Sequence, residues 1–589
     1  MKYVPKKNIS GLLNDINDPN KEISIAAPKR ARPSKTDNIF VPKFEIDKIH
    51  LYSFRKKLVK KIMRFCFYSL LFISGLSALV ILGAGSLKNN LQNPAENILE
   101  NFDKAVTSIM EFNPENAAGY LLKNKKEINE IKRGFHSPLG IVILAQGNKF
   151  LENVSNLNEY AFQTSKELQF LKENSLRVLM DEKQKGVLAG RLLRLKNLII
   201  SLRKESETAR NSIASVRDIH PKIDELKRWI TGEYLNYNQQ IYRLEAIIAN
   251  LGNILSRDKT RLLVFLENPA EIRPGGGFLG SYADISLAQG VIEKIEVIDI
   301  YDPDGQLAKK VVPPLPLQAI TTTWGARDAN WFFDFPLSAK KIIGFLEASE
   351  LYRQHSIEFE GAISINFRVI EDILKVLGPI ELEEYQLTIT PENFLTEVQR
   401  EVESGEDKTY GEPKRILKVL TPKIIQKVKE AGADKLFSML KAVEYRIGQK
   451  DVMAFMKNGE LQNFVAELGL SGESYKLPPD FWGSYLAVVN SNIAGGKTDA
   501  YIDDDIVFLS EIDSTGRIYE KTLLTRTHRG SEAPDFWLWK KDNQNFTKIF
   551  LAPDSLLVSV KNNSEKKITP PLNYERLKYE IDPDVKEVE

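Results

Sequence analysis

The residues with the clearest potential for chemistry lie in "EIRPGGGFLGSYADISL", Glu271–Leu287, where three spaced glycines follow an arginine. Gly275, Gly277 and Gly280 fit the dinucleotide-binding pattern G-x-G-x-x-G. That pattern binds a pyrophosphate only when a helix begins at the glycines, because the helix N-terminus holds the phosphate oxygens. The residues after Gly280 alternate like a strand instead. We therefore expect no nicotinamide dinucleotide here.

A second chemistry suits the same segment. Arg273 can present its planar guanidinium group to an oxyanion. Gly275, Gly276 and Gly277 allow the close approach of a ligand or of a neighbouring chain. The alternative is a glycine-rich turn between two strands, with Arg273 in an ordinary surface ion pair.

A cluster of carboxylates follows in "VIDIYDPDG". Carboxylate oxygens are the ligands that hard cations prefer, so Asp299, Asp302 and Asp304 predict a metal site with Mg²⁺ as the expected cofactor. The alternative is a solvent-exposed Asp-Pro-Asp-Gly turn. A single cysteine and five histidines, without an H-E-x-x-H pattern, argue against a zinc enzyme.

A third segment, "TTWGARDANWFFDFPLSAKK", concentrates polar and aromatic residues in a loop before a helix. Arg327, Asp328 and Asn330 are its candidate ligand-binding residues, and the tryptophans offer faces for a sugar or a lipid. The alternative is a packing loop that the tryptophans anchor. We expect the three segments to meet at the strand ends of one sheet, where open α/β folds commonly bind ligands.

The elements that carry these residues follow an uncharged segment from Phe65 to Leu87, which at about 23 residues is long enough to cross a bilayer. Seven basic residues between 48 and 64 precede it, so the positive-inside rule predicts a cytoplasmic N-terminus and an extracytoplasmic remainder. We predict a disordered cytoplasmic tail over 1–61 and a transmembrane signal anchor over 62–87. A buried helix of a soluble protein is the alternative.

Periodicity divides the rest of the chain. Residues 88–258 repeat apolar positions at alternating steps of three and four, which predicts a helical stalk or coiled-coil hairpin, with self-association through its seams as an alternative to intramolecular pairing. Residues 259–478 mix strands and helices, which predicts an α/β domain with a helical extension. Residues 479–589 are rich in strands and end in mid-pattern, which predicts an incomplete β-sandwich-like domain.

The sequence thus predicts a multidomain, membrane-anchored α+β protein of the cytoplasmic membrane. Its 81 Lys and Arg against 79 Asp and Glu give a net charge of +2, so we expect no nucleic-acid partner. Lys497 follows two glycines in "GGKTDAY", but no helix follows it, so we interpret this segment as a structural turn.

Four blocks in order resemble a known family. They read "NPAEIRPGGGFLGSY", "RDANWFFDFPLSA", "GAISINFRVIEDILKVLGPIEL" and "YLAVVNSNIAGGKTDAY". This series resembles the bacterial envelope family catalogued as domain of unknown function four-zero-one-two. Because that family has no established activity, the resemblance implies a fold and a cell-envelope location but no reaction.

A more distant similarity is to the LytR-CpsA-Psr phosphotransferases, which move a glycan phosphate from a polyprenyl pyrophosphate carrier with arginines and Asp-bound Mg²⁺. The resemblance implies that Arg273 matches the family's first arginine and that Arg415, in "EPKRILKVL", matches the arginine of its later helix. The family's Ile-Pro-Arg-Asp segment is replaced here by "IDIYDPDG", which lacks the arginine, so catalysis does not follow from the resemblance.

Two functions remain as hypotheses. The first is an extracytoplasmic protein that binds, and as an enzyme would transfer, a polyprenyl-pyrophosphate-linked glycan or cell-wall polymer. The second is a structural or adhesion protein of the cell surface without turnover. Clustered Arg and Asp favour the first, and the long stalk and terminal β-rich domain favour the second.

Overall fold

The computed structural model describes residues 88–111, 113–134, 144–214, 239, 241–481, 483–533, 537–553, 555–561 and 568–588. The predicted tail over 1–61 and the predicted anchor over 62–87 lie outside the described residues. Within the described residues, no helix combines the length and the apolar character that a bilayer crossing requires. The expected membrane-anchored fold class is therefore corrected to a mixed helical and β architecture.

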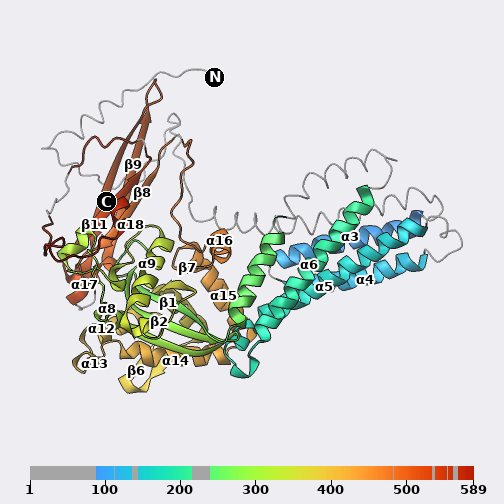
Figure 1. Cartoon of the computed structure of the whole chain (residues 1–589), viewed down its shortest axis with the longest axis horizontal. Helices are drawn as coiled ribbons and strands as arrows, with labels where there is room; N and C mark the ends of the chain where they lie inside the picture. Colours follow the sequence, from blue (N-terminus) through green and yellow to red (C-terminus); the bar gives the residue numbers. More distant parts are fainter. Residues whose placement is uncertain are drawn as a thin grey trace, which may run out of the picture. The chain divides into compact units, whose positions relative to one another are not determined.

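Long helices make up the first part of the described chain (Figure 1). They are α3 (Lys88–Met110), α4 (Pro114–Gly134), α5 (Leu144–Leu179), α6 (Val187–Ala214) and a helix over 241–256. The two apolar seams read from the sequence pack on each other, since Leu192, Leu195 and Ile199 of α6 share a cluster with Ile241 and Ile248. The seams thus pair within one chain, as the stalk prediction requires, and self-association through them stays a prediction.

A five-stranded mixed sheet forms the centre of the α/β domain, in the order β3-β2-β1-β4-β7. Its strands are β1 (Thr260–Asn268), β2 (Phe278–Ala288), β3 (Val291–Asp299), β4 (Gly361–Asn366) and β7 (Val452–Met456). Within this sheet, β1 and β4 are the one pair of neighbouring strands that runs parallel. The other three neighbouring pairs, β1–β2, β2–β3 and β4–β7, are antiparallel.

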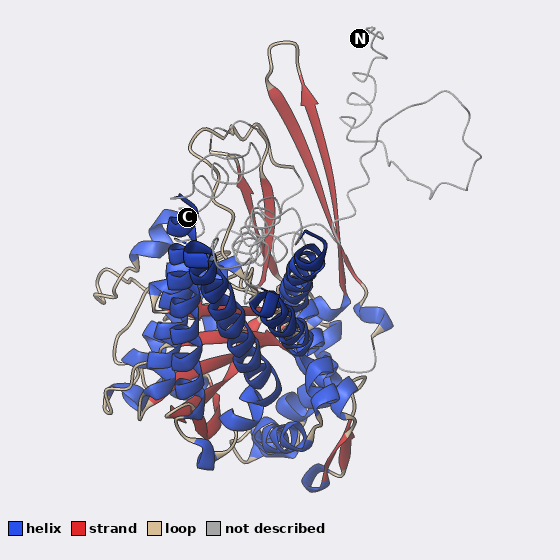
Figure 2. Ribbon diagram, turned by 90° about the vertical axis from the view of Figure 1, so that its right-hand side faces the viewer, coloured by secondary structure: helices blue, strands red, loops and turns tan. Residues whose placement is uncertain are grey.

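Helices cover both faces of this sheet, and strand β1 shows why. Leu263 and Phe265 belong to one hydrophobic cluster, whereas Val264 and Leu266 pack against another, as the two-residue period of a strand requires. The first cluster includes helix α9 (Phe335–Ala348). The second includes α11 (Phe367–Leu377), α12 (Phe394–Ser404) and α14 (Arg415–Glu430). The sheet is therefore the middle of three layers, which Figure 2 shows as strands between helices.

Further elements lie between α5 and α6 and within the α/β domain. They are η2 (Glu182–Gln184), α8 (Tyr301–Gly305), η3 (Leu315–Ala319), η4 (Ala326–Asp328), α10 (Glu350–Arg353), β5 (Ile380–Leu382), η5 (Glu383–Tyr385), β6 (Leu387–Ile389), α13 (Glu406–Thr409), α15 (Ala433–Gly448) and α16 (Gly459–Glu467). Strands β5 and β6 form a separate antiparallel pair.

The C-terminal strands do not form the predicted β-sandwich. In the described residues, β8 (Leu486–Asn492) pairs with β11 (Asn545–Leu551), and β9 (Ile502–Ile512) pairs with β10 (Ile518–His528), each as a separate two-stranded sheet. A sandwich needs two sheets that bury their facing side chains between them. Ten of the eleven residues of β9 are exposed instead. The strand periodicity was read correctly, but it does not reveal whether a second sheet covers the apolar face.

Short helical segments connect these strands and end the described chain: η6 (Thr498–Tyr501), η7 (Gly530–Glu532), α17 (Trp537–Lys540) and α18 (Pro583–Val588). This region packs on the α/β domain rather than standing apart from it. Trp331 stacks on Phe546 of β11 with ring centroids 5.9 Å apart. The indole Nε1 of Trp539 donates a 3.0 Å hydrogen bond to the side-chain oxygen of Gln399 in α12.

One buried carboxylate, that of Asp499, ties the C-terminal strands to the loop before Arg273. Its Oδ2 accepts from the backbone N–H of Ile272 at 3.1 Å and from the Asn492 amide at 2.7 Å. Its Oδ1 accepts from the Arg526 guanidinium of β10 at 3.0 Å. Only 5% of the Asp499 side chain is exposed. A buried carboxylate with this many donors fixes three chain segments at once.

The Asp499→Ala substitution tests this role. We expect it to reduce the stability of the folded chain by roughly 2–4 kcal/mol, because the backbone N–H of Ile272 and the amide of Asn492 lose this acceptor and Arg526, of its described ion-pair partners, keeps only Asp504. Thermal unfolding of the full chain, followed by tryptophan fluorescence, measures the loss. Asp542→Ala removes an exposed carboxylate from the same region and should change stability by no more than about 0.5 kcal/mol. Equal melting temperatures for the two variants would contradict the role of Asp499.

Candidate functional site

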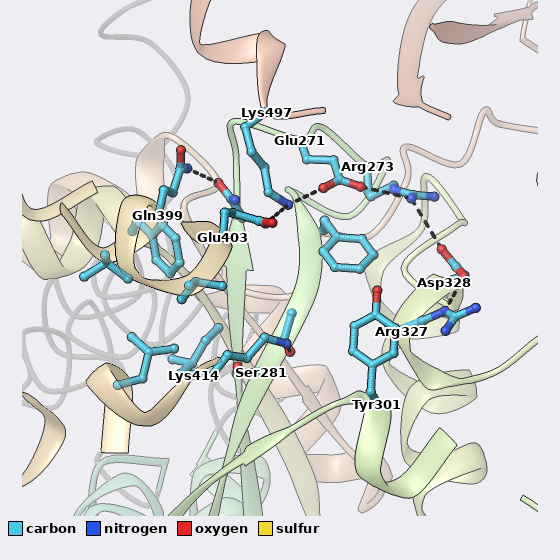
Figure 3. Close-up of a pocket in the computed structure, with 18 of the residues that line it drawn as sticks. Glu271, Arg273, Ser281, Tyr301, Arg327, Asp328, Gln399, Glu403, Lys414 and Lys497 are labelled. Atoms are coloured by element: carbon cyan, nitrogen blue, oxygen red, sulfur yellow. Dashed lines mark hydrogen bonds and ion pairs between the residues drawn. The ribbon is translucent and has the colours of Figure 1, made fainter. Parts of the chain in front are cut away.

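A cavity of about 310 Å³ lies at the end of strands β1 and β2, between the sheet and helices α12 and α14. One part of its lining is apolar, from Leu266, Phe367, Val398, Val402 and Leu417. The other part is charged, and Figure 3 shows its side chains around the opening between the loops. The charged residues that line it are Glu271, Arg273, Arg327, Asp328, Glu403, Lys414 and Lys497. The cavity therefore has a charged region and an apolar wall.

Two of the four cations lie against the ring of Phe278. The guanidinium carbon of Arg273 is 5.4 Å from the ring centroid, and Nζ of Lys497 is 5.1 Å from it. Lys497 also forms ion pairs with Glu271 and, at 3.9 Å, with Glu403 of α12. The ring and the carboxylates hold both cations in place with only 3% and 13% of the Arg273 and Lys497 side chains exposed, and this burial strengthens their electrostatic effect in the cavity.

The other two cations lie against the ring of Tyr301, the first residue of α8. The guanidinium carbon of Arg327 is 5.0 Å and Nζ of Lys414 is 5.2 Å from its centroid. Lys414 also pairs with Asp299 at 2.7 Å. Burial lowers the pKa of the Lys414 ammonium group, and the Asp299 carboxylate opposes that shift.

The two halves meet at Asp328, whose carboxylate is shared by both arginines. Its Oδ1 is 3.3 Å from Nη2 of Arg273, and its Oδ2 accepts a 3.0 Å hydrogen bond from Nε of Arg327. Figure 3 shows the two guanidinium groups on either side of this carboxylate. The Arg273 and Asp328 side chains are only 3% and 4% exposed. The structure thus brings together three residues that the sequence predicted separately.

Arg273 keeps unused hydrogen-bonding capacity despite its burial. Its Nη2 group is also 3.4 Å from Oε1 of Glu271, but its Nε and Nη1 atoms have no hydrogen-bond partner. The buried hydroxyl of Ser281, which also lines the cavity, has none either. Buried donors without partners are rare because each costs desolvation free energy. The site is therefore short of acceptors, which a ligand with oxygen atoms would supply.

Gly275, Gly276 and Gly277 allow other segments of this chain to approach closely, which is one of the two roles that the sequence suggested. A Cβ on Gly277 would lie 2.6 Å from the backbone carbonyl of Asn268, and one on Gly275 would lie 1.8 Å from Oδ1 of Asn330. Gly276 has φ of +124°. The structure does not place Gly275, Gly276 or Gly277 in the cavity lining.

Asn330 fixes the position of this glycine loop through hydrogen bonds. Its amide donates to the carbonyl of Gly277 at 2.9 Å and to the carboxyl of Glu267 at 3.0 Å. Glu267 is fully buried, and burial raises the pKa of its carboxyl well above the ordinary value. Asn330 does not line the cavity, so its role is to position the loop that carries Arg273.

The three predicted metal ligands are directed to different partners. Asp299 pairs with Lys414, and Asp302 is exposed. The Asp304 carboxylate accepts from the backbone N–H groups of Ala326, at 2.7 Å, and Arg327, at 3.3 Å. No group of three or more His, Cys, Asp or Glu side chains suited to a metal occurs in the described part of the chain. The clustered metal site is therefore not found there, because Asp299 ends strand β3 while Asp302 and Asp304 lie on helix α8 and are directed to solvent and to a backbone turn.

Two further site residues differ from the sequence prediction. Arg415 lies outside the cavity and forms a 3.3 Å ion pair with Asp407, whereas the preceding Lys414 lines the cavity. The exposed fraction of the Arg415 side chain is 42% and that of Lys414 is 14%. Lys497 lines the cavity as well, although we interpreted its segment as a structural turn. The only sequence feature that pointed to Lys497 as a site residue was the pair of glycines directly before it.

A sheet covered on both faces, with a charged cavity at its strand ends, defines an α/β domain with a candidate site. Residues 258–402 match the model of the family described as "Protein of unknown function (DUF4012)", so this part of the chain is similar to that family. This confirms the resemblance predicted from the sequence. No curated protein matches the chain. The cavity extends beyond the matched residues, because Lys414 and Lys497 follow residue 402.

The pKa of Asp304 gives a test by pH. Burial raises the pKa of its carboxyl from 3.8 to about 6, against the opposing effect of the backbone N–H groups that it accepts from. Because the folded state binds the proton more tightly, this stabilisation is complete below the unfolded pKa and is lost as pH rises through about 6. Between about pH 4 and pH 7, wild-type stability should fall by up to roughly 3 kcal/mol relative to Asp304→Asn.

Chemical denaturation of both proteins across this pH range measures the difference. Asp302→Asn, an exposed neighbour, serves as the control and should follow the wild type. A constant difference between wild type and Asp304→Asn at every pH would show that Asp304 does not titrate in this window.

Proposed function

We propose that the cavity binds the phosphate-bearing end of a lipid-linked glycan, with a polyprenyl pyrophosphate as the carrier. The observation that carries this proposal is Arg273, a buried guanidinium group with two nitrogen atoms that lack acceptors. Oxyanions are the acceptors that guanidinium groups bind most strongly.

The charge of the lining supports an anionic ligand. Four cationic and three carboxylate side chains line the cavity, which leaves a formal excess of one positive charge. The cations form two pairs, one on the ring of Phe278 and one on the ring of Tyr301, so two phosphate groups could each meet one pair. A pyrophosphate has this arrangement of charge.

The apolar wall supports a ligand that is not only a phosphate. The residues of this wall also line the cavity and belong to the second hydrophobic cluster or pack against it. They are Leu266, Phe367, Val398, Val402 and Leu417. A cavity with a cationic region and an apolar wall fits an amphiphile better than a free nucleotide or a sugar. The extracytoplasmic location stays a prediction, because it depends on residues 62–87.

The proposal assigns binding and leaves transfer unassigned. Each of the cations has a carboxylate partner, so a ligand would compete with Glu271, Asp328 and Asp299 for them. Mg²⁺ remains the cofactor expected from the sequence. It is tested by the same titrations in the presence of Mg²⁺ or of a chelator.

Arg273→Met is the most direct test. The substitution removes the buried cation but leaves Asp328 paired with Arg327, and Glu271 paired with Lys497, so no carboxylate loses its only partner. Calorimetric titration of the full chain with farnesyl pyrophosphate should show about 10- to 100-fold weaker binding, since a charged hydrogen bond contributes roughly 1.5–3 kcal/mol.

Arg353→Met is the matched control, because Arg353 is exposed and pairs with Glu350 on α10. It should bind like the wild type. Inorganic pyrophosphate should bind more weakly than farnesyl pyrophosphate if the apolar wall contributes. The proposal fails if the wild type binds neither compound, or if Arg273→Met keeps the wild-type affinity.

The neighbouring cations Lys414 and Arg415 provide a second test, because only the first lines the cavity. Lys414→Met should weaken farnesyl pyrophosphate binding by about 10-fold or more, whereas Arg415→Met should leave it unchanged. The same calorimetric titration compares the two variants. If Arg415→Met were the damaging substitution, the later helix would contribute its arginine, as the distant resemblance implies, and the geometry described above would be wrong.

A further inference from the structure

The two-stranded ribbon of β9 and β10 has an apolar surface that no described sheet covers. Figure 2 shows its two strands as a long hairpin. The exposed fractions of Ile506, Phe508 and Ile512 are 52%, 39% and 66%. None of the hydrophobic clusters in the described residues contains a side chain from either strand. An isolated two-stranded sheet is marginally stable in water, so such a surface normally packs against another element.

The register defines the two faces of the ribbon. Residues directly opposite each other share a face, and Ile506 pairs with Leu524 while Val507 pairs with Leu523. All even-numbered residues of β9 and β10 therefore lie on one face, the even face, and all odd-numbered residues lie on the other, the odd face. Each strand has 11 residues, so the ribbon is roughly 37 Å long.

We propose that the even face is a docking surface for a second copy of this chain, packed face to face about a two-fold axis. This proposal does not depend on the ligand proposed above. Its basis is that the even face is complementary to itself. The two-fold axis lies between the two ribbons, perpendicular to their strands, at the level of Val507 and Leu523. Each strand of one copy then lies over the same strand of the other copy, in the opposite direction.

The apolar residues match under this operation. Ile506 of one copy lies opposite Phe508 of the other, and Leu524 lies opposite Thr522. At the ends, Ile512 lies opposite Ile502. Apolar side chains therefore meet apolar or methyl-bearing ones at the centre of both strands and at the ends of β9, and the two sheets can pack at the usual spacing of about 10 Å.

The charged residues match as well. Glu520 lies three positions before the axis and Arg526 lies three positions after it, so each Glu520 faces the Arg526 of the other copy. Arg526 is 20% exposed, and its bonds to Asp499 and Asp504 fix it at the base of the ribbon. The carboxylate of Asp504 faces the hydroxyl of Ser510, which can donate to it.

The odd face does not match in this way. An equivalent axis on the other side of the ribbon would place Glu511 against Asp503 and Leu509 against Asp505. The first contact opposes like charges, and the second buries a carboxylate against an apolar side chain. Exposed apolar residues occur on both faces, since Val507 and Leu509 are each 50% exposed. Self-complementarity therefore distinguishes the faces, and apolar exposure alone does not.

The contact is small. Two ribbons of this size bury less area than the roughly 1,200 Å² typical of stable complexes, so we expect a weak dimer that forms with rising concentration. The test is sedimentation velocity of the full chain from about 1 to about 200 µM. The wild type should shift from monomer to dimer across this range.

Two adjacent residues of similar exposure provide the matched pair of variants. Ile506→Glu, on the even face, should move the dimer midpoint at least about 10-fold higher in concentration, while Val507→Glu, on the odd face, should leave it unchanged. Glu520→Lys should weaken the dimer because it opposes Arg526, and Glu511→Lys should not. All four positions are exposed, and circular dichroism confirms that each variant folds.

Three results would overturn the proposal. The first is a wild type that stays monomeric at every concentration, and the second is equal weakening by Ile506→Glu and Val507→Glu. The third is a dimer that these variants leave intact but that Leu193→Glu disrupts. Leu193 is 57% exposed on α6, so that result would place self-association on the exposed side of this helix.

Discussion

The candidate site depends on a chain of alternating charges that fixes its cations in a partly buried cavity. The chain runs through Glu403, Lys497, Glu271, Arg273, Asp328 and Arg327. A buried guanidinium group without a carboxylate would cost several kcal/mol, so the acids are a condition for having Arg273 there at all. The same acids keep the net charge of the cavity lining low. Because of this, attraction to positive charge alone would bind a ligand weakly, and the ligand must also supply hydrogen-bond acceptors or apolar contacts.

The chain of charges joins parts of the protein that are far apart in the sequence. Arg273 comes from the loop after β1, Asp328 from η4, and Lys497 from the loop before η6. The positions of these loops are set by polar contacts that do not touch the cavity. Asp499 holds the loop before Arg273, and Asp304 holds the turn that carries Arg327. Fold and site are therefore coupled through a few buried carboxylates, which explains why the cavity extends beyond the residues that match the family.

Much of the local structure follows from sequence patterns alone. The alternation in "GSYADISL" predicted the strand that became β2, so the glycine pattern is followed by a strand and not by the helix start that a dinucleotide-binding loop uses. The family resemblance was also visible in short blocks, three of which lie within the matched residues. The structure places Lys414 in the cavity lining and Arg415 outside it, for a physical reason. A helix turns by about 100° per residue, so neighbours at its first turn face different surroundings, and a one-residue difference decides which side chain enters the cavity.

The sequence by itself determined the types of element, the arginines and the carboxylates. Only the tertiary structure decided what those residues contact. Asp299, Asp302 and Asp304 lie within six residues, yet they face a lysine, solvent and a backbone turn, because a strand end and a short helix direct them apart. Arg273 and Arg327 are 54 positions apart and share one carboxylate. Local spacing fixes direction along one element, whereas charge pairing across elements depends on how the layers pack.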